Sequence, residues 1–200
     1  MSSKKGLLIV ISGPSGVGKT TLRQKLLTKY PEIKYSVSVT TRRPRKSELN
    51  GHDYVFVHME KFKKDIEKGL FAEWAEVGGN LYGTSKNFIE DAINSGYDIL
   101  LDIDVQGASQ LRKLYHEKGV FVFISPPSID TLRDRLKLRK TDSEQEIDAR
   151  IMLAKKEIKE CNNYNYVLVN KDLNKTLENL SHIISSEKCN KMNRKNENRK

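Results

Sequence analysis

The sequence predicts an α/β fold in which helices flank a parallel sheet, and three observations lead to this prediction. Short continuous apolar runs, typical of strands buried on both faces, recur along the 200 residues. Helical patterns separate these runs, and strands that alternate with helices indicate βαβ units with right-handed crossovers. A glycine-rich turn joins the first apolar run to the first helical pattern. A chain of this length suits a single domain that buries a sizeable core.

Each apolar run is expected to form one strand of the parallel sheet. The four runs lie at residues 7–11, 97–103, 120–124 and 166–169. Apolar residues at helical spacing predict the helices that connect them. These patterns lie at residues 21–30, 105–117, 129–139, 144–161 and 173–186.

Residues 36–84 interrupt this alternation. They contain strand-like pieces at residues 36–40, 54–57 and 71–77 and a helical pattern near residues 60–68. We expect an insertion with its own small sheet, and such insertions often carry function because the core does not depend on them. A second polar break, at residues 139–143 between two helical patterns, is typical of a lid that closes over a substrate.

The predicted organisation is one domain over residues 1–186. Its parts are a core at about 5–35 and 85–186, an insertion at about 36–84 and a helical lid at about 126–160. Residues 187–200, rich in Asn and Lys, are expected to form a basic, disordered tail.

The chain is basic, with 36 Lys and Arg against 26 Asp and Glu, a net charge of +10. This surplus is compatible with nucleic acid, an anionic membrane or small phosphorylated ligands as partners. The apolar runs are shorter than the ~18 residues that a membrane helix needs. The 2 cysteines lack metal-ligand spacing, and the first residues do not resemble a signal peptide. We therefore expect a cytoplasmic protein in a reducing compartment.

Residues 13–20 match the pattern G-x-x-x-x-G-K-[ST] between a buried strand and a helix, the context that this phosphate-binding loop requires. Its glycines lack Cβ atoms, so successive backbone N–H groups can surround phosphate oxygens. The N-terminus of the following helix adds unpaired donors. Lys19 would supply a charge to the β- and γ-phosphates and Thr20 a hydroxyl to Mg²⁺. The loop predicts a nucleoside triphosphate site, but leaves open whether the γ-phosphate goes to water, to a small molecule or drives movement on nucleic acid.

Hydroxyls and arginines are concentrated in residues 36–45. Arginine forks and tyrosine hydroxyls suit a phosphate dianion held in a fixed orientation. Glu73 beside hydroxyl donors suits a guanine edge, because guanine presents two N–H donors where adenine presents an acceptor at N1. As a charge run alone, Arg42, Arg43, Arg45 and Lys46 would form a solvated basic face or a nucleic-acid patch. The nearby phosphate loop favours a nucleotide phosphate.

Here the sequence resembles the guanylate kinases, P-loop enzymes that pass a phosphoryl group from ATP to GMP, and the likeness runs from about residue 7 to residue 184. The motifs that carry it lie at residues 13–20, 38–45, 50–56, 82–84, 101–107 and 126–128. The resemblance implies a P-loop core with a GMP-binding insertion and a mobile lid. It implies ATP and GMP (or dGMP) as substrates, Mg²⁺ with ATP as cofactor, no nucleic-acid or membrane partner, and a monomer or weak dimer.

The resemblance also implies roles for individual residues. The ATP-binding set is Gly13, Ser15, Gly16, Val17, Gly18, Lys19, Thr20, Thr21, Arg135, Asn170 and Lys171. The GMP-binding set is Ser38, Arg42, Arg45, Glu48, Tyr54, Glu73, Tyr82, Gly83, Thr84, Asp102 and Asp104. The catalytic set is Lys19, Arg45, Arg139 and Arg150. Thr20, with ATP, and Asp102, through water, would serve Mg²⁺.

Two positions depart from the family pattern. Lys140 stands where a glycine is common after the lid arginine, and Lys171 where an acid is usual. Two other functional classes remain open: a catalytically inactive relative that binds phosphorylated peptides, and a nucleic-acid factor that uses the positive charge. The intact phosphate loop favours the enzyme. Trp74, next to Glu73, is interpreted either as a wall of the base pocket or as an ordinary core aromatic.

Overall fold

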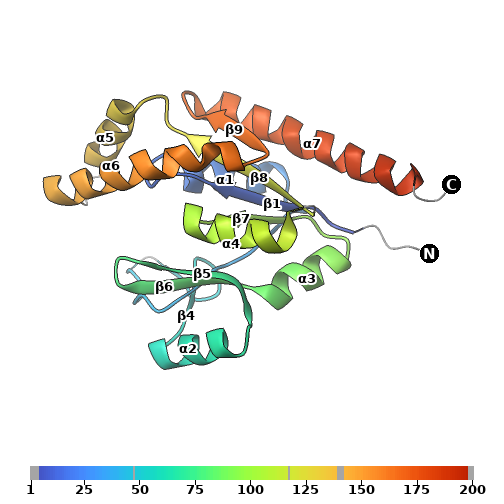
Figure 1. Ribbon diagram of the computed structural model, residues 1–200, viewed down its shortest axis with the longest axis horizontal. Coiled ribbons are helices and arrows are strands. Elements are labelled where there is room, and N and C mark those ends of the chain that lie inside the picture. The colour runs from blue at the N-terminus through green and yellow to red at the C-terminus, as the bar shows by residue number, and fades with distance from the viewer. Residues whose placement is uncertain (1–4, 47, 117, 139–141, 198–200) are drawn as a thin grey trace. The chain divides into compact units, whose positions relative to one another are not determined.

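A computed structural model describes residues 5–46, 48–116, 118–138 and 142–197, and the chain divides into two compact units (Figure 1). Unit 1 comprises Met1–Leu8 and Glu32–Gly119, and unit 2 comprises Ile9–Pro31 and Val120–Lys200. The division into core, insertion and lid that the sequence suggests follows other boundaries and stays a prediction.

Unit 2 is built on parallel strands in the order β1-β8-β9. Their bounds are β1 Leu8–Ser12, β8 Gly119–Ser125 and β9 Tyr166–Val169, and β8 pairs parallel with β9. The central residues of β1 and β8 are fully buried, as their continuous apolar sequences predict. The helices of this unit are α1 Lys19–Lys29, α5 Ile129–Leu138, α6 Glu144–Lys159, the 3₁₀ turn η1 Glu160–Asn163 and α7 Leu173–Glu197. Helix α1 packs against α7, and α5 packs against α6.

Unit 1 contains a second parallel pair, β2 (Lys34–Tyr35) with β7 (Ile99–Asp102). The Ile99 amide donates to the Leu7 carbonyl at 2.8 Å, directly before β1 begins. Helix α3 (Lys86–Asn94) leads into β7, and α4 (Val105–Tyr115) follows it. The parallel pairing in both units agrees with the sheet expected from the βαβ pattern.

A small four-stranded sheet, in the order β4-β3-β6-β5, forms the rest of unit 1. Its strands are β3 Val39–Thr40, β4 Val55–Phe56, β5 Phe71–Val77 and β6 Asn80–Ser85. Gly78 and Gly79, with φ of 58° and 73°, turn β5 into β6, because a two-residue hairpin of this kind needs two positive φ angles. Helix α2 (Met59–Glu67) covers one face of this sheet and α4 the other (Figure 1).

The expected strands and helices are confirmed, with boundaries shifted by a few residues. Strands β2 and β6 and helix α3 were not expected. Strand β6 reads Asn-Leu-Tyr-Gly-Thr-Ser, a mixture that lacks the apolar alternation of a strand. Helix α3 is short, but Ser85 caps it by accepting a hydrogen bond from the Phe88 amide, and three apolar residues at helical spacing are buried beneath it.

The expectation of a disordered tail is wrong for residues 187–197, because α7 continues to Glu197. The first part of the helix is fixed by packing on α1 and β9, with Leu180 and Ile184 buried. The Tyr166 hydroxyl donates to Glu187 at 2.6 Å. Once a helix is nucleated, each further residue adds a backbone hydrogen bond at little cost, so a polar sequence can prolong it. In the part of the chain that the structure describes, no helix is long and apolar enough to span a bilayer.

Replacing Phe62 by alanine should destabilise unit 1 strongly. Phe62 is fully buried on α2 and stacks on Phe71 of β5 with ring centroids 4.4 Å apart. Its truncation leaves a cavity, so we expect a loss of about 3–5 kcal/mol in the free energy of unfolding, measured by urea denaturation. Phe88→Ala is the matched control, because Phe88 is 41% exposed and its loss should cost less than about 1 kcal/mol. Equal losses for the two variants would contradict this account of the packing.

Candidate active site

The phosphate loop of unit 2 has the backbone shape that its sequence predicts. Gly13, Gly16 and Gly18 have φ of 140°, 90° and 102°, in the region that favours glycine. Neighbouring side chains also occupy the space that a Cβ atom on Gly16 or Gly18 would need. A Cβ on Gly16 would lie 2.9 Å from Leu136 of α5, and a Cβ on Gly18 would lie 2.6 Å from the Asn170 amide nitrogen. Helix α1 begins directly after Gly18, and among the described residues no side chain makes a capping hydrogen bond at this N-cap.

Lys19, the first residue of α1, lies across this loop. Its ammonium donates to the Gly13 carbonyl at 2.6 Å and to the Pro14 carbonyl at 3.1 Å. These two carbonyls hold the charge over the loop, where a phosphate would be bound by the backbone amides. An ammonium has three donors, so Lys19 can bind an anion while it keeps contacts with the loop.

Arg150 reaches the same loop from α6. Its Nη1 donates to the Ser15 hydroxyl at 2.9 Å, and its Nε pairs with Asp142 at 3.2 Å. Ser143 and Glu146 form a reciprocal capping box that fixes the start of α6. The structure therefore brings a predicted catalytic arginine to a predicted ATP-binding residue, and it also pairs this arginine with Asp142.

A second group of residues holds the backbone of the loop through hydrogen bonds. Arg135 of α5 donates to the Val17 carbonyl at 3.2 Å and to the Asn170 carbonyl at 2.9 Å. The Asn170 side chain donates to the same Val17 carbonyl at 2.8 Å and accepts a hydrogen bond from Thr176 at 3.1 Å. Arg135 and Asn170 are thus brought together beside Val17, and Thr176, which was not expected, orients the Asn170 amide.

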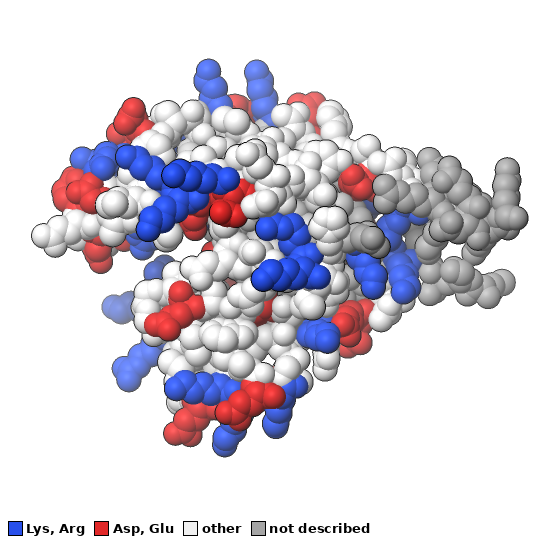
Figure 2. Space-filling model, viewed as in Figure 1, with Lys and Arg blue, Asp and Glu red and all other residues white. Residues whose placement is uncertain are grey.

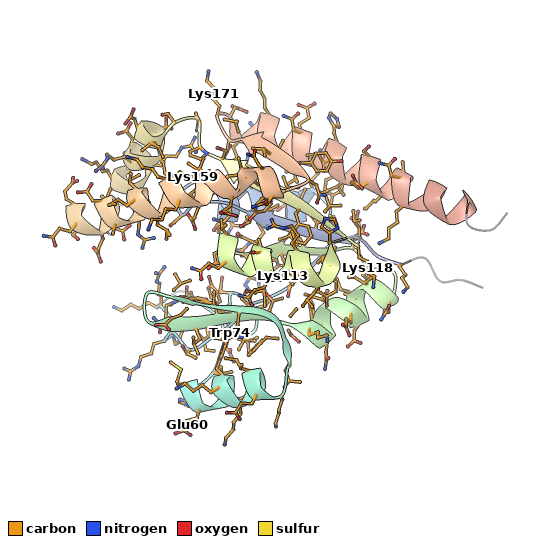
Figure 3. All side chains as sticks on the ribbon, viewed as in Figure 1. Glu60, Trp74, Lys113, Lys118, Lys159 and Lys171 are labelled. Atoms are coloured by element: carbon orange, nitrogen blue, oxygen red, sulfur yellow. The ribbon has the colours of Figure 1, made fainter. Side chains whose placement is uncertain are left out.

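The other predicted donor-side residues are more exposed. Thr20 and Thr21 lie in the first turn of α1 with their side chains exposed. Lys171 follows β9 and extends from the surface (Figure 3). Arg139 and Lys140 lie outside the described residues.

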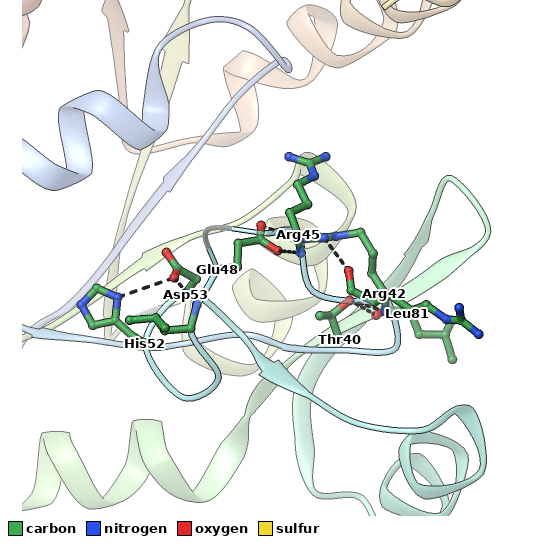
Figure 4. Close-up of polar contacts among 9 residues, drawn as sticks. Thr40, Arg42, Arg45, Glu48, His52, Asp53 and Leu81 are labelled. Carbon is green, nitrogen blue, oxygen red and sulfur yellow. Dashed lines mark hydrogen bonds and ion pairs between the residues drawn. The ribbon is translucent and has the colours of Figure 1, made fainter. Parts of the chain in front are cut away.

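In unit 1 an arginine, a glutamate and two tyrosines form what we call the arginine cluster: Arg42, Glu48, Tyr54 and Tyr82. Arg42 donates to Glu48 at 2.8 Å (Figure 4). Its guanidinium lies 5.3 Å from the centre of the Tyr54 ring. The Tyr54 and Tyr82 rings meet edge to face at 5.9 Å. The hydrogen bond that Arg42 donates to Glu48 raises the pKa of Arg42, and the Tyr82 hydroxyl acts in the same direction.

Glu48 also orders the turn that carries the second arginine. One carboxylate oxygen accepts from Arg42, and the other accepts from the Arg45 backbone amide at 2.8 Å (Figure 4). These hydrogen bonds, with the one from Arg42 the larger cause, hold the pKa of Glu48 below its ordinary value. The carboxylate lies beside Arg42 in the manner of a bound phosphate, which requires the same fork of donors.

Glu73 of β5 is a buried carboxylate, only 5% exposed. It lies opposite Thr84 of β6, whose hydroxyl donates to it. Burial raises the pKa of Glu73 to about 7, the Asp104 carboxylate adds to the increase, and the Thr84 hydrogen bond opposes it. Asp104 caps α4 by accepting from the Gly107 amide at 2.7 Å. A carboxylate, a hydroxyl and a second carboxylate thus converge on one buried site, as the predicted guanine pocket requires.

Trp74 does not belong to this pocket. Successive residues of a strand point to opposite faces, so Trp74 points away from the face that carries Glu73. It is 39% exposed and pairs with Gly83 across the hairpin (Figure 3). Neither interpretation made from the sequence, pocket wall or core aromatic, is correct. Gly83 is needed on that second face, because a Cβ there would lie 3.0 Å from both Phe62 and Phe71.

Two further predicted residues, Ser38 and Asp102, lie at the ends of strands in unit 1. The Ser38 carbonyl accepts from the Val55 amide at 2.9 Å and so joins β3 to β4. Asp102 is the last residue of β7, half-buried, two residues before Asp104.

On the face seen in Figure 2, basic and acidic side chains are interspersed over the described residues.

Comparisons with known proteins agree with this geometry. The family model described as Guanylate kinase matches residues 5–187. The guanylate kinase of Geobacter metallireducens is 46% identical over 186 residues, which cover 93% of this chain and 91% of that protein. The guanylate kinase of Clostridioides difficile is 46% identical over 194 residues, covering 97% and 94%.

A solved structure extends the likeness to the fold. The crystal structure of guanylate kinase from Anaplasma phagocytophilum matches with a TM-score of 0.77 at 39% identity, and covers 93% of this chain and 88% of that chain. The resemblance indicated by the motifs, and the P-loop α/β fold that it implied, are thereby confirmed. This chain belongs to the guanylate kinase family.

Proposed function

We propose that this chain transfers the γ-phosphoryl group of ATP to the phosphate of GMP, reversibly, and so forms ADP and GDP. The observation that carries the proposal is the arginine cluster together with the buried Glu73–Thr84 pair in the same unit. An enzyme that only hydrolyses ATP needs no second site with a phosphate fork and a carboxylate for a base. A kinase that takes a nucleotide monophosphate as acceptor needs both.

ATP would bind at the phosphate loop of unit 2. The open amides of the loop and of the first turn of α1 would hold its phosphates, and Lys19 would neutralise charge on the β- and γ-phosphates. Arg150 contacts Ser15 of the loop and is suited to stabilise charge that develops on the transferred group. Arg135 and Asn170 would hold the loop backbone, and Lys171 would lie on the adenine side.

GMP would bind in unit 1. Arg42, Tyr54 and Tyr82 would hold its phosphate, and Arg45 would bridge the acceptor and the transferred phosphates. The ionised Glu73 carboxylate would accept the guanine N1–H and N2–H, while Thr84 and Ser38 supply hydroxyls. Adenine would present a lone pair to that carboxylate and leave it without a donor, which is a strong basis for discrimination.

The transfer itself needs positioning and charge stabilisation more than proton transfer. The acceptor phosphate is already an anion, so its oxygen attacks in line and no general base is required. Exclusion of water by lid closure would prevent hydrolysis of ATP. The cations of both sites, with Arg139 as expected from the family, would take up the charge that spreads over the transferred oxygens.

Mg²⁺ would accompany ATP. The Thr20 hydroxyl and the Asp102 carboxylate are hard oxygen donors of the type that Mg²⁺ prefers. Among the described residues, no group of three or more His, Cys, Asp or Glu side chains could hold a metal ion by itself. The two oxygen donors fit a Mg²⁺ ion that is bound mainly through nucleotide phosphates and water. In that position the ion would neutralise phosphate charge. A cytoplasmic location and a monomeric or weakly dimeric state stay predictions.

The decisive experiment measures ADP release from ATP with and without GMP, in the presence of Mg²⁺. We expect GMP to accelerate ADP release, and Lys19→Met to reduce the rate by about 100-fold or more because the loop loses its only lysine charge. AMP and UMP are the control acceptors and should give little acceleration. Release that GMP does not accelerate would contradict the proposal. Binding of a phosphorylated peptide without nucleotide binding would instead favour the inactive-relative alternative.

Arg42→Lys should raise the KM for GMP by about tenfold, because a lysine cannot engage Glu48 and a phosphate through one planar fork. The KM for ATP should stay within about twofold of wild type. Arg43→Lys is the matched control, since Arg43 accepts a hydrogen bond from Arg42 through its backbone carbonyl, which the substitution keeps. Steady-state kinetics with each substrate varied in turn give both constants. Equal effects of the two substitutions would contradict a specific role for Arg42.

The pH dependence of GMP binding should follow the titration of Glu73. Its pKa of about 7 means that the carboxylate needed for guanine is lost as pH falls through 7, so GMP affinity should fall. Stability should change in the opposite sense: the buried neutral acid is favourable at low pH, and this contribution is lost as pH rises through about 7. Glu73→Gln should therefore bind GMP weakly at every pH, and should be more stable than wild type at pH 8 by at most about 3 kcal/mol. Calorimetric titration and thermal unfolding at pH 5 to 8 check this.

A further inference from the structure

Gln110 of α4 makes a paired contact with the backbone of β5. Its Oε1 accepts from the Trp74 amide at 3.2 Å, and its Nε2 donates to the Trp74 carbonyl at 2.7 Å. Strand β5 lies at the edge of the four-stranded sheet, and among the strands that the structure describes β6 is its neighbour. The carboxamide of Gln110 thus takes the place of a peptide group from a missing neighbouring strand, one residue beyond Glu73.

The register of β5 needs such a restraint. The pairing of β5 with β6 shifts between Phe71 and Glu73, the sign of a β-bulge. A slip by one residue moves every side chain to the opposite face of a strand. Here it would replace the Glu73 carboxylate in the pocket by the methyl group of Ala72 or the ring of Trp74. Either change would remove the acceptor that a guanine edge requires.

The electrostatics of the pocket also favour displacement of β5. Glu73 is ionised only at a cost in its buried site, and Asp104 lies near it with the same charge. Three residues on one face of α4 lie beside this part of β5. They are the N-cap Asp104, Gly107 and Gln110, which are spaced three residues apart. Gly107 leaves room for the carboxylate, since a Cβ there would collide with Glu73 Oε2. Of these three residues, Gln110 is the one that forms hydrogen bonds with the backbone of β5.

We propose that Gln110 is a positioning residue that fixes the register of β5 at its bulge and thereby holds the Glu73 carboxylate toward the guanine base. The inference rests on the proposed function, because it assigns Gln110 a part in recognising the acceptor. Gln110 touches no reacting atom. It acts through the backbone of Trp74.

The test compares Gln110→Ala with Gln106→Ala, the same change at the exposed glutamine of α4. Gln110→Ala should raise the KM for GMP by about tenfold and leave the KM for ATP within about twofold. The preference for GMP over IMP, which lacks the 2-amino group, should fall. Gln110→Glu keeps the acceptor for the Trp74 amide but loses the donor, so it should change the same constants if the alanine variant does not fold. Gln106→Ala should match wild type.

A double substitution separates positioning from general stability. In a Glu73→Gln background, Gln110→Ala should have little further effect on the GMP-to-IMP ratio, because the carboxylate that it positions is gone. Additive effects would overturn the inference. Trp74 is the 1 tryptophan of the chain, so its fluorescence reports the environment of β5 directly.

Amide exchange of Trp74 gives a readout that needs no substrate. Exchange should be faster in Gln110→Ala than in Gln106→Ala, and unchanged exchange would overturn the inference. If wild type phosphorylates GMP while Gln110→Ala behaves as the control does, the inference fails and the proposed function stands. If wild type shows no GMP-dependent ADP release although Trp74 exchange responds to Gln110, the proposed function fails instead.

Discussion

The burial of one carboxylate, that of Glu73, is the constraint to which the surrounding structure of unit 1 responds. An ionised group in a buried site is costly unless hydrogen bonds compensate it, and Asp104 adds a like charge. The Thr84 hydroxyl supplies one hydrogen bond, and Gly107 supplies space. Strand and helix are both shaped around this group, although a hydrophobic residue at position 73 would serve stability better. Such a conflict between stability and local chemistry is typical of a functional site.

Three cations of the two sites have protein acceptors in the structure. Lys19 is held by loop carbonyls, Arg150 by Ser15 and Asp142, and Arg42 by Glu48. These contacts preorganise long side chains that would otherwise lose conformational freedom when an anion binds. They are also weaker competitors than a phosphate, because a carbonyl carries no charge and Glu48 occupies one edge of the Arg42 fork. The arrangement keeps each charge in place and leaves donors to spare.

The sequence was most informative where one signal decides the structure. Continuous apolar runs predicted the parallel strands, and the loop motif predicted the backbone shape around Gly16 and Gly18. Strand β6 could not be recognised, because it lacks apolar alternation and its polar residue Thr84 is buried against Glu73. Gln110 and Thr176 were missed because no local sequence pattern marks their hydrogen-bond partners. The error at Trp74 was avoidable, since two-residue periodicity puts it opposite Glu73.

Gly18 shows how firmly a fold can close one position to evolution. Its backbone is left-handed, with φ of 102°, and the amide of Asn170 occupies the space where a side chain would begin. A smaller residue at 170 would relieve the crowding but not the backbone penalty, and it would remove the amide that supports Val17. Besides glycine, only a D-amino acid could adopt this positive φ without the backbone penalty, and the genetic code encodes none. No single compensating substitution therefore opens a route away from glycine, and a lineage that retains this loop retains the residue with it.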